Sequence, residues 1–250
     1  MQANALDHVA LWVADRDTLA DLVCRHLGMH VIDRTDNFTL MGSDARRGKL
    51  TLFDAEGPRD PGVLERVVLR VSDLDDALTK LPADLAVRQT GGLASFEGPE
   101  GLGLGLTPGA GEGPDYDIDH VVLRVPEPER TLDALTGFGF ERRNGALAVA
   151  DKSVRVVSGC SGEGERPLLN HIALLVDSAD ELHDEAKRRG LDVADYVDAA
   201  NTLAVFVWGP DRIKLEYVEH KPGFSLEYRH ARSRRGRGRH GRTGGRSTRA

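Results

Sequence analysis

One short apolar phrase occurs four times in the 250-residue chain, and this repetition constrains the fold more than any other feature. The copies are LDHVALWV at 6–13, LERVVLRV at 64–71, IDHVVLRV at 118–125 and LNHIALLV at 169–176. A period near 50 residues is typical of internal duplication. The Val, Ile and Leu residues of each phrase predict a buried or half-buried strand.

The segments that come after the four phrases are also similar. In the fourth unit Ser178 can cap a helix that ends at Gly190, and three strand-like runs come after it, LDVADYV, NTLAVFVWGPD and RIKLEYVEH. We therefore predict an α+β fold of four βαβββ modules. One module has too few strands to bury both faces of its sheet, so the modules should pair into two domains, each a cupped, mostly antiparallel sheet around a cavity.

Chain order suggests which modules pair. Modules one and two would form an N-terminal domain at 1–108, and modules three and four a C-terminal domain at 115–222. The segment TPGAGEGPDYD at 107–117 is rich in Gly and Pro and marks the boundary.

The third position of the repeated phrase holds candidate metal ligands. It is His8, Arg66, His120 and His171 in the four copies. The last strand of the fourth module adds Glu216, seven residues after the Gly of a GPD turn, where the second module has Gly105. A metal ion needs lone-pair donors, and a guanidinium is a permanent cation. The predicted metal ligands are therefore His120, His171 and Glu216, and Arg66 marks a site that has lost its metal.

Each of these residues also has a plain structural interpretation. A single histidine at the start of a strand is more often a hydrogen-bonded residue than a ligand, and Glu216 could face solvent. The conjunction of two equivalent histidines with a glutamate favours the metal. For His8 we expect only a structural or leftover role, and for His183 and His220 solvent exposure.

The phrases DHVVLRV, NHIALLV and GPDRIKLEY resemble the vicinal oxygen chelate superfamily, which includes glyoxalases, bleomycin resistance proteins and extradiol dioxygenases. The resemblance covers roughly residues 6–220 and is greatest to the type I extradiol ring-cleavage enzymes. It implies a metal in the C-terminal domain, held at the positions of His120, His171 and Glu216. Two histidines and one carboxylate form the facial triad of non-haem Fe(II) oxygenases, so Fe(II), or Mn(II) instead, is the implied cofactor.

The sequence departs from the dioxygenase pattern at two places. No histidine lies between His183 and His220 to serve as the usual acid–base group, and Phe206 stands where a tyrosine is usual. Tyr196, Asp198 and Asn201 are the nearby polar candidates to replace that catalytic function.

Composition limits the partners and the compartment. The tail at 229–250 holds nine arginines and no acidic residue, and without it 24 basic residues face 40 acidic ones, which makes the rest a poor nucleic-acid binder. We expect the tail to be disordered. The sequence shows no signal-peptide profile, no apolar run long enough for a membrane span, and no CxxC pair, so we expect a cytoplasmic protein. Assembly into a homo-oligomer stays open.

Three functions remain. The first is a ring-cleaving dioxygenase that uses O2 on a small catecholic or related aromatic substrate. The second is a non-redox metalloenzyme of the same superfamily, such as an isomerase, an epimerase or a thiol-adding enzyme, whose metal polarises vicinal oxygens. The third is a small-molecule-sequestering resistance protein without catalysis. The intact ligand set disfavours the third.

Overall fold

The computed structural model describes residues 1–109, 113–159 and 166–222. The arginine-rich tail at 229–250, for which the sequence predicts disorder, lies outside these ranges. Within them, no helix combines the length and the apolar character that a membrane crossing requires.

Four units with the same order of elements follow one another along the chain, as predicted. Unit one contains β1 (Ala5–Val13), α1 (Arg16–His26), β2 (His30–Arg34), β3 (Phe38–Gly42) and β4 (Lys49–Asp54). Unit two contains β5 (Leu64–Val71), α2 (Leu74–Thr79), β6 (Arg88–Thr90), β7 (Leu93–Glu97) and β8 (Gly103–Pro108). Unit three contains β9 (Asp117–Val125), α3 (Pro128–Thr136), β10 (Glu141–Arg143), β11 (Ala146–Val149) and β12 (Lys152–Ser158). Unit four contains β13 (Leu169–Leu175), α4 (Ala179–Arg188), β14 (Val193–Asp198), β15 (Thr202–Trp208) and β16 (Lys214–His220).

Local signals in the sequence explain where the elements begin and end. The hydroxyl of Ser178 accepts a hydrogen bond of 3.2 Å from the backbone N–H of Glu181, which caps α4 as predicted. Gly190 follows the end of that helix with φ +66°, a conformation that costs glycine little. The GPE and GPD turns are short 3₁₀ segments, Pro99–Gly101 and Pro210–Arg212, before the last strands of units two and four.

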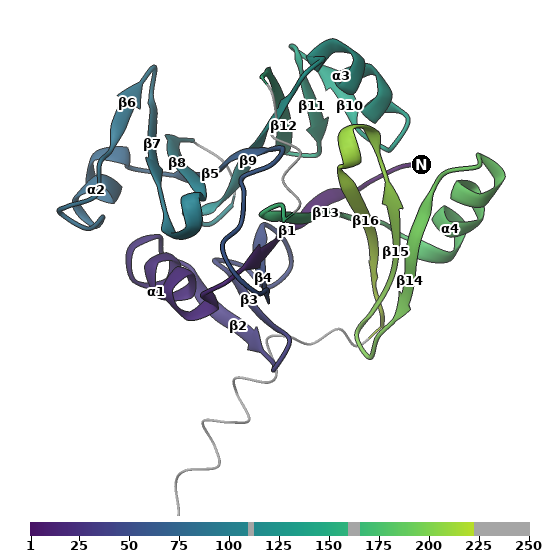
Figure 1. Cartoon of the computed structure of the whole chain (residues 1–250), viewed down its shortest axis with the longest axis horizontal. Coiled ribbons are helices and arrows are strands. Elements are labelled where there is room, and N and C mark those ends of the chain that lie inside the picture. The colour runs from purple at the N-terminus through teal and green to yellow at the C-terminus, as the bar shows by residue number, and fades with distance from the viewer. Residues whose placement is uncertain (110–112, 160–165, 223–250) are drawn as a thin grey trace, which may run out of the picture.

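The units pair differently from the prediction. One sheet has the order β14-β15-β16-β13-β1-β4-β3-β2 and so joins units four and one, whereas the other has the order β10-β11-β12-β9-β5-β8-β7-β6 and joins units three and two. We call them the β1–β13 sheet and the β5–β9 sheet after their central pairs. Figure 1 shows β1 and β13 side by side although they belong to the first and the fourth unit of the chain. The predicted pairing by chain order is therefore wrong, and the segment 107–117 connects β8 and β9 within one sheet.

Both sheets are mixed and mostly antiparallel. In each, the two central strands run antiparallel, and each central strand pairs in parallel with the last strand of its own unit. A single hydrophobic cluster includes Leu6 and Ile172 from one central pair and Val67 and Val121 from the other.

Candidate metal centre

Strand register brings three metal-binding side chains together on one face of the β1–β13 sheet. Ala173 on β13 is the register partner of His8 on β1 and also of Glu216 on β16, so these three residues form one row across the sheet. His171 lies two residues before Ala173 and therefore points to the same face. Ala173 is small, which leaves space between the ligands on either side.

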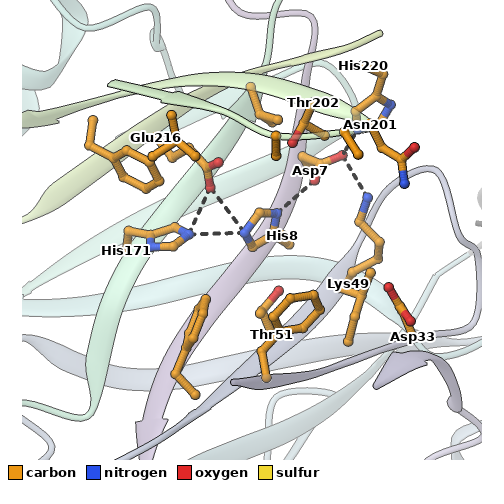
Figure 2. Close-up of a pocket in the computed structure, with 18 residues that line it drawn as sticks. Asp7, His8, Asp33, Lys49, Thr51, His171, Asn201, Thr202, Glu216 and His220 are labelled. Carbon is orange, nitrogen blue, oxygen red and sulfur yellow. Dashed lines mark hydrogen bonds and ion pairs between the residues drawn. The ribbon is translucent and has the colours of Figure 1, made fainter. Parts of the chain in front are cut away.

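The ligand atoms are close to one another. The Nε2 atoms of His8 and His171 are 3.0 Å apart, and the Oε2 atom of Glu216 lies 2.8 Å from His171 Nε2 and 3.2 Å from His8 Nε2 (Figure 2). Ligand atoms about 2.1 Å from a metal at adjacent octahedral positions would be about 3.0 Å apart. The spacing therefore suits three neighbouring positions on one side of a single ion.

The chemistry of the three residues fits a divalent metal as well. Glu216 Oε2 is buried and makes ion-pair contacts with the Nε2 atoms of His8 and His171, so a cation among these three atoms would meet one carboxylate oxygen and two imidazole nitrogens. His8, His171 and Glu216 are a group whose ligand atoms all lie within 4.8 Å of one another. Two neutral imidazoles and a carboxylate are the donor set of a facial triad.

Both histidines are held by the residue that precedes them. His8 Nδ1–H donates to the carboxylate of Asp7 at 2.7 Å, and His171 Nδ1–H donates to the amide oxygen of Asn170 at 3.0 Å. Each ring therefore directs its Nε2 atom toward Glu216. Asp7 also accepts from Lys49 Nζ at 2.9 Å and lies 3.1 Å from His220 Nε2.

The carboxylates set the protonation of the site. Burial works to lower the pKa of His8, but the charges and hydrogen bonds of Glu216 and Asp7 outweigh it and raise the pKa to about 9. Burial works to raise the pKa of Glu216, yet His171 and His8 bring it down to about 2. Burial lowers the pKa of His171, with Glu216 opposing. The ligand set therefore carries one exchangeable proton at neutral pH, on His8, in the place where a cation would bind.

The fourth position of the site is a threonine. Ala10 on β1 is the register partner of His171 and of Thr51 on β4, so a second row, His171–Ala10–Thr51, mirrors the row His8–Ala173–Glu216. Thr51 thus occupies the position that corresponds to Glu216 in the other half of the sheet. The side chain at this position is a neutral hydroxyl, so it adds no carboxylate to the three ligand residues found in the described part of the chain.

A cavity of about 370 Å³ opens next to these residues. Its wall is largely apolar at Phe38, Phe53 and Phe206, and the Phe206 ring packs edge-on against His171 with the ring centroids 5.2 Å apart. Polar side chains also line it: Asp7, Asp33, Lys49, Thr51, Asn201, Thr202 and His220. Figure 2 shows that Asp7, Asn201 and His220 lie at the end of the cavity away from His171.

The structure corrects one predicted metal ligand. His171 and Glu216 are in the cluster, but His120 lies in the β5–β9 sheet, and His8 takes the place predicted for it. The reason is the pairing of units: His8, not His120, is on the strand that runs beside β13. In the β5–β9 sheet, register places His120 in a row with Val68 and Gly105, neither of which has a metal-ligating side chain. There the Arg66 side chain covers Gly105, whose absent Cβ would lie 3.1 Å from Arg66 Cδ.

The three predicted acid–base candidates differ in position. Asn201 lines the cavity. Tyr196 does not, because its side chain is 38% exposed and its hydroxyl donates to Asp180 at 2.6 Å. Asp198 pairs with Lys221 and is not among the cavity residues.

Sequence reasoning misses His220 and Asp7. His220, expected in solvent, faces the cavity and approaches Asp7. One signal for Asp7 is present in the sequence: Asp or Asn precedes all three phrase histidines.

Comparisons with known proteins agree with this architecture. Residues 5–85 match the family described as the Glyoxalase/Bleomycin resistance protein/Dioxygenase superfamily. No curated protein matches the sequence. Among solved structures, a "putative dioxygenase" from Bacillus subtilis subsp. subtilis str. 168 has a TM-score of 0.72 and 17% identity, with 93% of this chain and 95% of that chain covered.

Two further structures share the fold. Glyoxalase I from Zea mays has a TM-score of 0.67 and 15% identity, with 90% of this chain and 94% of that chain covered. The cppA protein from Streptococcus pneumoniae TIGR4 has a TM-score of 0.58 and 15% identity, with 87% of this chain and 100% of that chain covered. The family match thus covers the first unit and the beginning of the second, and the likeness to these structures shows that the chain shares their fold of paired βαβββ units.

Proposed function

We propose that this protein is a metal-dependent ring-cleaving dioxygenase of the extradiol type, acting with O2 on a small catecholic or related aromatic substrate. The observation that carries the proposal is the ligand set, in which His8, His171 and Glu216 hold one side of a site and Thr51 stands at the fourth position. Three protein ligands leave three positions of an octahedral ion open, enough for both oxygens of a catechol and for O2.

The cavity supports an aromatic substrate. Phe38, Phe53 and Phe206 give it flat apolar walls, and a single benzene ring with small substituents fits within about 370 Å³. The edge-on contact between Phe206 and His171 fixes the wall relative to the ligands. A catechol could therefore lie between aromatic side chains with its two oxygens directed at the ligand set.

The protein residues have separable roles in such a reaction. Iron(II), when bound, would supply the electronic coupling between an aromatic diol and dioxygen. Glu216 contributes the negative charge that retains a divalent ion, and the histidines contribute neutral donors. His220, at the polar end of the cavity and 3.1 Å from Asp7, is placed to accept and return the protons of the substrate hydroxyls.

The test is oxygen uptake by iron-loaded protein. Protein purified without oxygen, loaded with Fe(II) and mixed with catechol should consume about one O2 per substrate and form a yellow ring-opened product. The Glu216→Ala variant should lose this uptake, and His120→Ala should keep it. If the iron-loaded protein binds catechols and consumes no O2 with any of them, the dioxygenase proposal fails.

A non-redox metalloenzyme is the second candidate, and one observation favours it. His220 lies beside the ligand set, 3.1 Å from the Asp7 carboxylate, and an imidazole there could move a proton as an isomerase or epimerase would require. In that case the protein should be active with zinc, nickel or cobalt and should need no O2. Absence of any bound metal would instead favour the sequestering protein.

A further inference from the structure

An acceptor side chain precedes each of the three phrase histidines and accepts a hydrogen bond from its ring. Asp7 is 2.7 Å from His8 Nδ1, Asp119 is 2.6 Å from His120 Nδ1, and Asn170 Oδ1 is 3.0 Å from His171 Nδ1. The three pairs therefore share one local geometry, in which Nδ1–H is satisfied and Nε2 is left to point elsewhere.

Asp7 differs from the other two acceptors in its surroundings. It is 2% exposed, and its second oxygen, Oδ1, lies 2.9 Å from Lys49 Nζ and 3.1 Å from His220 Nε2. Lys49 is itself buried and also donates to the carbonyl oxygen of Ala45 at 3.3 Å. The carboxylate of Asp7 is thus fixed from two further strands, β4 and β16, while its Oδ2 atom holds His8.

We propose that Asp7 is a positioning residue for the metal centre, which fixes the tautomer and the orientation of His8 and makes His8 the stronger of the two histidine ligands. This inference rests on the proposed function only in requiring that the site binds a metal. A carboxylate on the far nitrogen of a ligating imidazole increases the electron density at the ligating nitrogen and restricts rotation of the ring.

The two histidines are unequal because their acceptors are unequal. A hydrogen bond to an ionised acceptor is roughly twice as strong as one between neutral groups. His8 has the ionised acceptor at the shorter distance, and His171 has the neutral amide at the longer one. Lys49 and His220 keep Asp7 from turning away from His8, so they act on the metal through two intervening side chains.

The chain supplies its own matched control. Asp119 and His120 repeat the Asp–His pair in the β5–β9 sheet, where register places His120 in a row with Val68 and Gly105, neither of which offers a ligand atom on its side chain. Asp7→Asn and Asp119→Asn are therefore the same chemical change at the same repeat position, and only the first lies at the ligand cluster.

The experiment measures Zn²⁺ binding to the full chain by competition with a chromophoric chelator. Asp7→Asn should weaken binding about 10–100-fold, and Asp119→Asn should leave the dissociation constant unchanged. In the zinc-loaded protein, the Nδ1–H proton of His8 should give a far-downfield NMR signal that shifts in Asp7→Asn and persists in Asp119→Asn. Asp7→Asn also removes the buried negative charge beside Lys49. The double variant Asp7→Asn, Lys49→Met removes both charges together, so it tests the loss of the Asp7 carboxylate without leaving a buried positive charge uncompensated.

Each outcome decides the matter. Weakened zinc binding in both Asp7 variants, together with unchanged binding in Asp119→Asn, supports the inference. Unchanged affinity in a folded Asp7 variant overturns it while the proposed metal site stands, and equal weakening in Asp119→Asn overturns it as a general effect on the fold. If the wild-type protein binds no zinc and no other divalent metal, the proposed function and this inference fall together.

Discussion

Replacing His8 by alanine tests the assignment of the metal ligands, with His120→Ala as its counterpart in the β5–β9 sheet. His8 Nε2 lies 3.0 and 3.2 Å from the other two ligand atoms, so its loss removes one of three protein donors. Zinc sites with four protein ligands bind with about 10–16 kcal/mol, or roughly 3 kcal/mol per ligand. His8→Ala should therefore raise the dissociation constant for Zn²⁺ about 100-fold, and His120→Ala should leave it unchanged.

A thermal shift measurement reads this difference directly. At a zinc concentration about 100 times the wild-type dissociation constant, binding adds about 2.7 kcal/mol to the free energy of unfolding, which raises Tm by about 5–10 °C for a chain of this size. For His8→Ala the same concentration would only equal the dissociation constant and add about 0.4 kcal/mol, or about 1 °C. If His8→Ala keeps the full zinc-dependent shift, or if His120→Ala loses it, the ligand assignment is wrong.

Three further predictions concern the proposed metal centre, two from substitutions and one from the effect of pH. Thr51→Glu should supply a second carboxylate opposite Glu216. Metal content should be kept or rise, and O2 uptake with catechol should fall at least tenfold. Unchanged uptake would mean that Thr51 does not adjoin the coordination positions that the three ligands leave open. Ala173→Val introduces the residue that the β5–β9 sheet has at the equivalent position, Val68, and should fill the space between His8 and Glu216. Zinc affinity should fall, and the free energy of unfolding should fall by about 1–3 kcal/mol. Unchanged zinc affinity would mean that Ala173 does not lie between the two ligands. Because the pKa of His8 is raised to about 9, its proton must leave when a metal binds. Zinc binding at pH 7 should thus release about one proton, and the affinity for zinc should rise about tenfold per pH unit up to about pH 9. Calorimetry in buffers of different ionisation enthalpy measures the number of protons released, and a value of zero would contradict the prediction.

The four units can be predicted from the sequence because each is specified locally. The strand phrase has its own apolar pattern, Ser178 caps its helix through a contact three residues away, and the GPE and GPD turns precede the last strands of their units. These signals all lie within one unit, so the sequence of a single unit is enough to predict its strands and its helix.

The partner of each unit cannot be predicted in the same way. Pairing of β1 with β13 joins residues 158 to 170 positions apart, and the four phrases are so alike that either pairing gives plausible strand contacts. The pairing decides the site: His171 and Glu216 belong to one unit and can be predicted together, whereas the second histidine comes from another unit and is His8 in place of His120. The sequence does not predict that Thr51 and His220 lie at the site, for the same reason. Their positions relative to the ligands depend on the register between β1, β4, β13 and β16.

The most direct measurement is the position of the metal itself. Crystals of the Mn(II)- or Zn(II)-loaded protein, measured at the absorption edge of the metal, would give an anomalous peak at each bound ion. One such peak is expected in the β1–β13 sheet, at roughly 2.0–2.3 Å from His8 Nε2, His171 Nε2 and a Glu216 carboxylate oxygen. A peak beside His120 in the β5–β9 sheet, or a fully loaded protein with no peak near Glu216, would contradict it.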